Sequence, residues 1–261
     1  MGGRPRCVEP ATEFTKPFLL LIPGTLCDAR MFARQSRALR SSAVVHCADY
    51  THLRDVSSWI DRLLKRLPPT FSVAGFSLGG LLALEMLRRA PQRIDRVALI
   101  SSNAQAASPK GARRSAWLHK LWQERGAGVV AKHVKPAYFH HEAKRRAHQQ
   151  RVLGMALKTP WHSAFAQFDW AANRPQGFDA LQAFAGPLLA VAGAKDRLCP
   201  PAWQRAMQQV QPRMTVVELQ RCGHFVPLES PAQLNHALIH WLNKPVAPST
   251  QELTAITLGV L

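Results

Sequence analysis

The sequence predicts an α/β protein, with a mostly parallel sheet, helices on both faces and an inserted helical cap. Three observations favour this class. Short apolar segments alternate with helical patterns along most of the chain. The apolar segments are continuous hydrophobic runs, which is typical of strands buried on both faces of a parallel sheet. One long stretch, 104–182, carries no strand pattern.

Four apolar runs bounded by turn residues predict the first strands. They cover residues 18–22, 43–47, 70–74 and 94–100. Between them, good helix formers with apolar residues at helical spacing predict three helices. These cover residues 28–39, 56–66 and 80 to about 91. Short apolar strands connected by helices pair in parallel, because each helix carries the chain back before the next strand begins.

The last part of the chain repeats this alternation. Strands are expected at 187–192 and 214–219, and helices at 202–210 and 231–242. The strandless stretch interrupts the sheet at a point where an insertion lies over the carboxyl ends of the strands, and ligands bind there. The expected division is an N-terminal extension 1–17, a core of 18–103 and 183–243, a helical cap 104–182 and a C-terminal tail 244–261.

A Gly-x-Ser-x-Gly motif lies where the third strand is expected to turn into a helix. Ser77 stands at its centre, between Gly75 and Gly79. The two glycines allow close backbone packing around a sharp turn that holds the serine hydroxyl clear of the sheet. Ser77 is therefore the predicted nucleophile.

A serine hydroxyl is a weak nucleophile until a base accepts its proton and an acid orients that base. Asp196 follows the expected strand 187–192, and His224 follows the expected strand 214–219. Both loops leave the same edge of a parallel sheet as the Ser77 turn. We therefore predict Asp196 as the acid and His224 as the base, rather than Asp169 or Asp179, which lie in the cap or at its edge.

The eleven histidines offer other candidate bases, but only His224 follows a strand in a suitable loop. His236 and His240 lie four residues apart on the last expected helix, which is a spacing seen in metal sites. No third ligand is evident nearby in the sequence, so no metal site is expected.

Attack of a serine on an acyl carbon also needs donors for the negative charge that develops on the carbonyl oxygen. The amide of Leu78, directly after the nucleophile, is one predicted donor. The second is expected from the loop after the first strand. Thr25 is preferred there, with Leu26 as the alternative and as a candidate substrate contact.

These motifs together resemble the α/β-hydrolase family over nearly all of residues 18–243. The matching pieces are LLLIPGT, GFSLGG, GAKDRLCP and CGHFVPLESP. Two departures stand out. The chain has Pro23-Gly24 where the family commonly has His-Gly, and only seventeen residues precede the first core strand, so the N-terminal hairpin of the family is expected to be absent or reduced.

The resemblance implies hydrolysis of an ester or a thioester without a cofactor. The chain resembles small capped bacterial carboxylesterases, including those that demethylate pimeloyl-carrier-protein esters. The leading hypothesis is therefore a serine carboxylic-ester hydrolase acting on a small-molecule or acyl ester. Thioester hydrolysis, C–C bond hydrolysis and a lyase reaction remain alternatives on the same fold.

The net charge of +18 is the second unusual feature. Between residues 104 and 180, thirteen lysines and arginines stand against four acids. A basic cap attracts anionic partners, so Arg145 and Arg146 are candidate contacts to an anionic substrate or an acyl carrier protein. Phe139 and Trp161 are candidate apolar contacts. A solvated basic surface is the alternative.

A non-catalytic protein that binds nucleic acid or another anion is the remaining class. The basic residues are spread along the chain without a recognised nucleic-acid motif, which disfavours that class. No apolar run approaches the length of a membrane span. Five scattered cysteines without a CxxC pair favour reduced thiols and a cytoplasmic location.

Overall fold

The computed structural model describes residues 16–134, 138–140 and 142–246. Its centre is a six-stranded sheet in the order β2-β1-β3-β4-β5-β6, and every pair of neighbours is parallel. The strands are β1 (Phe18–Ile22), β2 (Val44–Cys47), β3 (Phe71–Phe76), β4 (Ile94–Ile100), β5 (Leu188–Gly193) and β6 (Thr215–Leu219). This arrangement confirms the predicted fold class. The question of an N-terminal hairpin concerns residues 1–15, which lie outside the described residues.

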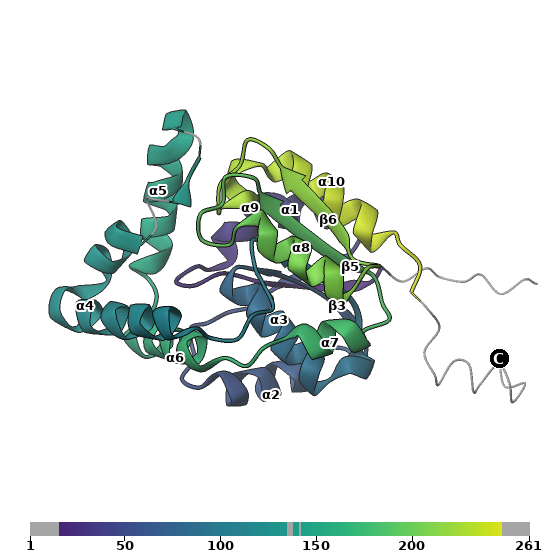
Figure 1. Ribbon diagram of the computed structural model, residues 1–261, viewed down its shortest axis with the longest axis horizontal. Coiled ribbons are helices and arrows are strands. Elements are labelled where there is room, and N and C mark those ends of the chain that lie inside the picture. Colours follow the sequence, from purple (N-terminus) through teal and green to yellow (C-terminus); the bar gives the residue numbers. More distant parts are fainter. Residues whose placement is uncertain (1–15, 135–137, 141, 247–261) are drawn as a thin grey trace, which may run out of the picture.

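Helices cover both faces of this sheet (Figure 1). Alternate side chains of a strand point to opposite faces, so Leu20 of β1 joins one core cluster and Leu21 joins the other. The first face packs against α2 (Val56–Arg66), α3 (Leu78–Arg89), α7 (Phe178–Ala183) and α8 (Pro201–Val210). The second face packs against η1 (Ala29–Phe32), α1 (Ala33–Leu39), α9 (Val226–Glu229) and α10 (Pro231–Leu242). A 3-10 turn, η2 (Pro91–Arg93), leads into β4.

The helical insertion forms its own layer beside the body. It contains α4 (Pro109–Val134), α5 (Glu142–Ala156) and α6 (Trp161–Asn173), and α4 and α6 lie side by side (Figure 1). A third hydrophobic cluster joins these helices, and Leu26 of the body is buried within it. In contrast, α7 contacts α3 and α8 of the body. The boundaries of the cap at 104 and 182 stay a prediction.

Three local features differ from the expected elements. The expected helix 28–39 begins as the 3-10 turn η1, because the Asp28 carboxylate accepts from the amide of Arg30 at 2.9 Å and tightens the first turn. Gly126, at φ 73°, interrupts α4, within the stretch 104–182 for which no individual helices were predicted. The short helix α9 was not expected. No helix within the described ranges is long and apolar enough to cross a membrane.

Candidate active site

Ser77 occupies the single residue between β3 and α3, with φ 54° and ψ −115°. A Cβ atom at Gly75 would lie 2.2 Å from the Gly79 carbonyl oxygen, and one at Gly79 would lie 2.0 Å from the Ile22 carbonyl oxygen. Only glycine fits at these two positions. The Ser102 hydroxyl donates to the Ser77 carbonyl oxygen at 2.8 Å, which braces the turn from the end of β4.

The predicted base and acid lie beside this serine. His224 Nε2 is 3.1 Å from Ser77 Oγ, and His224 Nδ1 is 2.8 Å from Asp196 Oδ2. Both His224 and Asp196 are buried, at 2% and 4% exposure. Three residues that are distant in sequence thus form one hydrogen-bonded chain at the carboxyl edge of the sheet, which is the geometry that serine activation requires.

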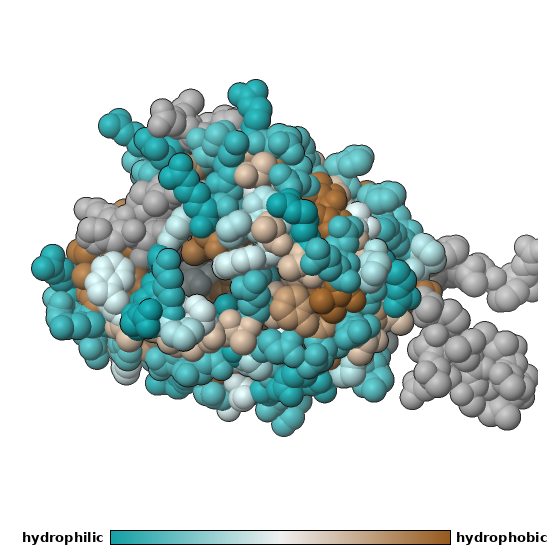
Figure 2. Space-filling view, viewed as in Figure 1, coloured by the Kyte–Doolittle hydropathy of each residue, from teal (hydrophilic) through white to brown (hydrophobic). Residues whose placement is uncertain are grey.

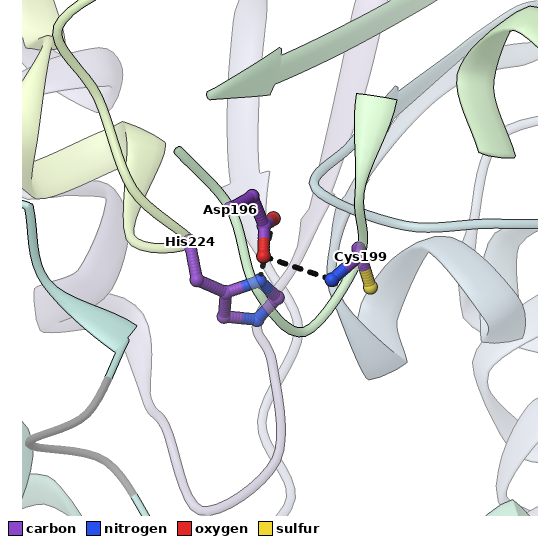
Figure 3. A group of neighbouring side chains, drawn as sticks. All are labelled: Asp196, Cys199 and His224. Atoms are coloured by element: carbon purple, nitrogen blue, oxygen red, sulfur yellow. Dashed lines mark hydrogen bonds and ion pairs between the residues drawn. The ribbon is translucent and has the colours of Figure 1, made fainter. Parts of the chain in front are cut away.

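Backbone amides fix the Asp196 carboxylate. Its Oδ1 accepts from the amides of Leu198 and Cys199, each at 2.8 Å, which leaves Oδ2 for the imidazole. Figure 3 shows Asp196 between His224 and the Cys199 backbone. The carboxylate therefore holds one orientation, in which it accepts from Nδ1–H and directs the lone pair of Nε2 at the serine.

Side-chain atoms of Asp196, Cys199 and His224 lie within 4.8 Å of one another, a spacing compatible with a metal ion. The donor set fits that use poorly. A metal needs the thiolate form of cysteine, and burial raises the pKa of Cys199 well above its usual value. The carboxylate and Nδ1 also already satisfy each other. These groups suit an acid–base pair better than a cation site.

A buried carboxylate that the sequence analysis missed holds the His224 loop. Glu229 Oε1 accepts from the amide of Phe225 at 3.1 Å, and Oε2 accepts from the amide of His140 at 2.8 Å. The amide of His224 donates to the Tyr138 carbonyl oxygen at 2.9 Å. The insertion is thereby tied to the histidine loop. In the sequence, Glu229 carries no signal for this role, because it lies in the loop before the expected helix 231–242, where a glutamate is usually solvated.

The candidate oxyanion donors, Thr25 and Leu78, line the same cavity as Ser77. Leu78 is the first residue of α3, and the first amides of a helix have no partner within the helix. Thr25 lies in the loop after β1, and the next residue, Leu26, has φ 54°. The amide of Leu26, the alternative donor, is engaged by Gln167 Oε1 at 2.8 Å. Thr25 and Leu78 stay the predicted pair.

A cavity of about 220 Å³ opens at Ser77 and His224 and is bounded by Thr25, Leu26 and Leu78. Figure 2 shows a hollow on this face between the insertion and the body. The wall is largely apolar, and it includes Leu81, Leu118, Val130, Phe168 and Trp203. Two arginines, Arg114 and Arg174, also line it, and no aspartate or glutamate among the described residues does. The cavity suits an acyl group of modest size.

Four other predicted contacts lie outside this lining. Phe139 is buried and stacks on Phe225, with ring centroids 4.4 Å apart. Trp161, at the start of α6, is 61% exposed. Arg145 and Arg146 are exposed on α5. Contact of these four residues with a substrate stays a prediction.

Comparison with known proteins agrees with this architecture. Biotin biosynthesis bifunctional protein BioHC of Teredinibacter turnerae is 23% identical over 199 residues, which cover 69% of this chain but only 34% of that protein. Pimeloyl-[acyl-carrier protein] methyl ester esterase of Aromatoleum aromaticum is 28% identical over 205 residues, 67% of this chain and 75% of that protein.

The structure is also similar to that of a thermophilic esterase from Thermogutta terrifontis. The TM-score is 0.76 at 24% identity, over 87% of this chain and 90% of that one, which shows a shared fold. The model of the alpha/beta hydrolase family matches residues 19–237, which include Ser77, Asp196 and His224. The chain belongs to the alpha/beta hydrolase family.

Proposed function

We propose that this chain hydrolyses a carboxylic ester through an acyl-enzyme formed on Ser77. The observation that carries the proposal is the hydrogen-bonded chain from Asp196 through His224 to Ser77 at the mouth of an apolar cavity. Curated relatives named as esterases support the same reaction.

In the first half-reaction, Ser77 Oγ attacks the acyl carbon while His224 Nε2 accepts the hydroxyl proton. The Thr25 and Leu78 amides hold the oxygen that becomes negative. The C–O bond to the leaving alcohol then breaks, and His224 returns the proton to that alcohol. In the second half-reaction, water gives a proton to His224 Nε2 and attacks the acyl carbon. The bond from that carbon to Ser77 Oγ then breaks, and His224 returns the proton to Ser77 Oγ, which releases the acid and restores the free serine.

A fluorophosphonate probe tests the nucleophile, because it reacts only with an activated serine. The wild-type protein is expected to be labelled, and Ser77→Ala is expected to remain unlabelled and inactive toward p-nitrophenyl esters. Ser41→Ala serves as the control, since Ser41 is exposed in the turn before β2 and lines no part of the cavity. Equal labelling of wild type and Ser77→Ala would exclude Ser77 as the nucleophile.

We further propose that the natural substrate is an acyl ester on an acidic carrier protein. Arg114 and Arg174 place two cations in the lining of the cavity, and no ion pair to either is found within the described residues. Arg145, Arg146 and Arg151 lie exposed on the neighbouring helix α5. Two curated relatives are named for an ester on an acyl carrier protein, which supports this substrate class.

The double variant Arg145→Glu/Arg146→Glu tests the carrier protein. Its kcat/KM for a methyl ester on acyl carrier protein is expected to fall by about tenfold or more at low salt, because charge at a binding surface accelerates capture of an oppositely charged partner. The loss should shrink near physiological salt, where the Debye length is about 8 Å. A small neutral ester should be turned over as by wild type.

Lys65→Glu/Arg66→Glu provides a matched control, because it makes the same change in net charge at exposed positions on α2. Equal losses for the two double variants would mean that only overall charge matters. An unchanged kcat/KM for Arg145→Glu/Arg146→Glu at low salt would exclude carrier-protein capture by α5.

A further inference from the structure

One buried side chain of the insertion reaches the loop that is expected to supply an oxyanion donor. Gln167 lies on α6 and is 1% exposed. Its Oε1 accepts from the amide of Leu26 at 2.8 Å, and its Nε2 donates to the Ser163 hydroxyl, one turn earlier, at 3.1 Å. An N–H can only donate, so the oxygen of the Gln167 amide must face Leu26.

This contact fixes the plane of one peptide unit. The Leu26 N–H and the Thr25 C=O belong to the same planar group. Gln167 holds the N–H end, and the Cys27 thiol, 3.3 Å from the Thr25 oxygen, donates to the carbonyl end. The orientation of this plane sets the backbone of Thr25, whose own amide is the predicted oxyanion donor.

The Leu26 side chain adds a second attachment. It is 1% exposed and lies in the cluster formed by α4, α5 and α6. Its backbone has φ 54°, a conformation that leucine adopts only where the surroundings impose it. The insertion therefore supplies both the pocket for the side chain and the acceptor for the amide.

We propose that Gln167 is a positioning residue that couples α6 to the oxyanion loop. The predicted donor at Thr25 is then correctly placed only while α6 is seated on the body. The inference rests on the proposed esterase function, but it concerns a residue that does not touch the reacting atoms. Removal of the acceptor should weaken binding of the transition state more than binding of the substrate.

Gln167→Met tests this coupling, because methionine has a similar length and no carbonyl acceptor. With a small neutral ester, kcat is expected to fall by about 10- to 100-fold, which is no more than the fall in kcat when a whole oxyanion donor is removed. KM is expected to stay within about twofold of the wild-type value. A trifluoromethyl ketone that forms a tetrahedral adduct should lose affinity in parallel with kcat. The product acid should bind as to wild type.

Leu121→Ala is the matched control. Leu121 is buried in the same cluster, but it does not line the cavity or contact the loop amide. Truncation leaves a cavity inside the cluster, so the melting temperature should fall. The Gln167 contact to the Leu26 amide remains, so kcat should change by no more than about twofold. If Leu121→Ala and Gln167→Met lose kcat equally at equal melting temperature, Gln167 is a packing residue and the proposal is wrong.

Ser163→Ala gives a milder test should Gln167→Met fail to fold. It leaves the Gln167 acceptor in place but frees the other end of the side-chain amide. A several-fold loss of kcat at unchanged KM is therefore expected, and an unchanged kcat would overturn the proposal.

Turnover by the wild-type protein separates the esterase hypothesis from the coupling hypothesis. An inactive wild type contradicts the esterase function, whereas an active wild type with insensitive Gln167 and Ser163 variants contradicts only the coupling.

Discussion

Asp196→Asn is expected to lower kcat by about 10⁴-fold, with little change in KM, as removal of the orienting carboxylate does in serine triads. The introduced side-chain amide can present its N–H₂ group to His224 Nδ1, which forces the ring proton onto Nε2. The nitrogen that faces Ser77 Oγ at 3.1 Å then carries a proton and cannot accept another. The volume of the side chain is nearly unchanged, so the fold should be retained.

Steady-state kinetics with a p-nitrophenyl ester measure this loss, and circular dichroism checks the fold. Asp179→Asn and Asp169→Asn are the controls, because both acids are exposed and lie away from His224. They should retain wild-type kcat. A loss below about tenfold in Asp196→Asn would remove Asp196 from the orienting role.

Gly79→Ala is expected to destabilise the protein by more than about 4 kcal/mol, which is exceptional for one methyl group. The added Cβ would lie 2.0 Å from the Ile22 carbonyl oxygen and 2.6 Å from the Pro23 carbonyl oxygen. Both obstacles are backbone atoms, so no change of side-chain rotamer relieves the overlap. Either α3 or β1 must shift, and the shift would separate Ser77 from the oxyanion loop.

Urea unfolding, or soluble yield where the variant does not fold, measures the loss. Gly128→Ala is the matched control, because the nearest atom to its added Cβ is 3.7 Å away on the Leu157 side chain. A glycine-to-alanine change inside a helix that has room should be neutral or stabilising by up to about 1 kcal/mol. A Gly79→Ala variant within about 1 kcal/mol of wild type would contradict the close approach of β1 and α3.

The sequence predicted the strands well because their apolar runs are continuous and bounded by turn residues. The ends were less accurate around Ser77. The expected strand stopped at residue 74 and the expected helix began at residue 80, whereas β3 reaches Phe76 and α3 starts at Leu78. The glycines around Ser77 predicted a sharp turn, but the local pattern did not show that the strand and the helix would extend to the residues on either side of Ser77. The one-residue connection between β3 and α3 depends on backbone contacts with β1 and β4, which lie far away in the sequence.

The residues in the hydrogen-bonded chain were predictable for a different reason. Ser77, Asp196 and His224 each follow a strand, and parallel strands bring their carboxyl ends to one edge whatever the details of packing. The roles of Gln167 and Glu229 could not be predicted in this way. They depend on which backbone amides come within hydrogen-bond distance when the insertion packs on the body. The periodicity of apolar residues along one helix does not show which amides these are.

By itself, then, the sequence determined the parallel sheet and the edge at which nucleophile, base and acid gather, because strand order along the chain and local turn chemistry dictate both. Only the tertiary structure decided how the insertion engages that edge. The Leu26 amide donates to Gln167, which is 141 positions away in the sequence, and the His140 amide donates to Glu229, which is 89 positions away. Buried amides must be paired, and the partner for each is selected by the packing of whole helices rather than by neighbouring residues.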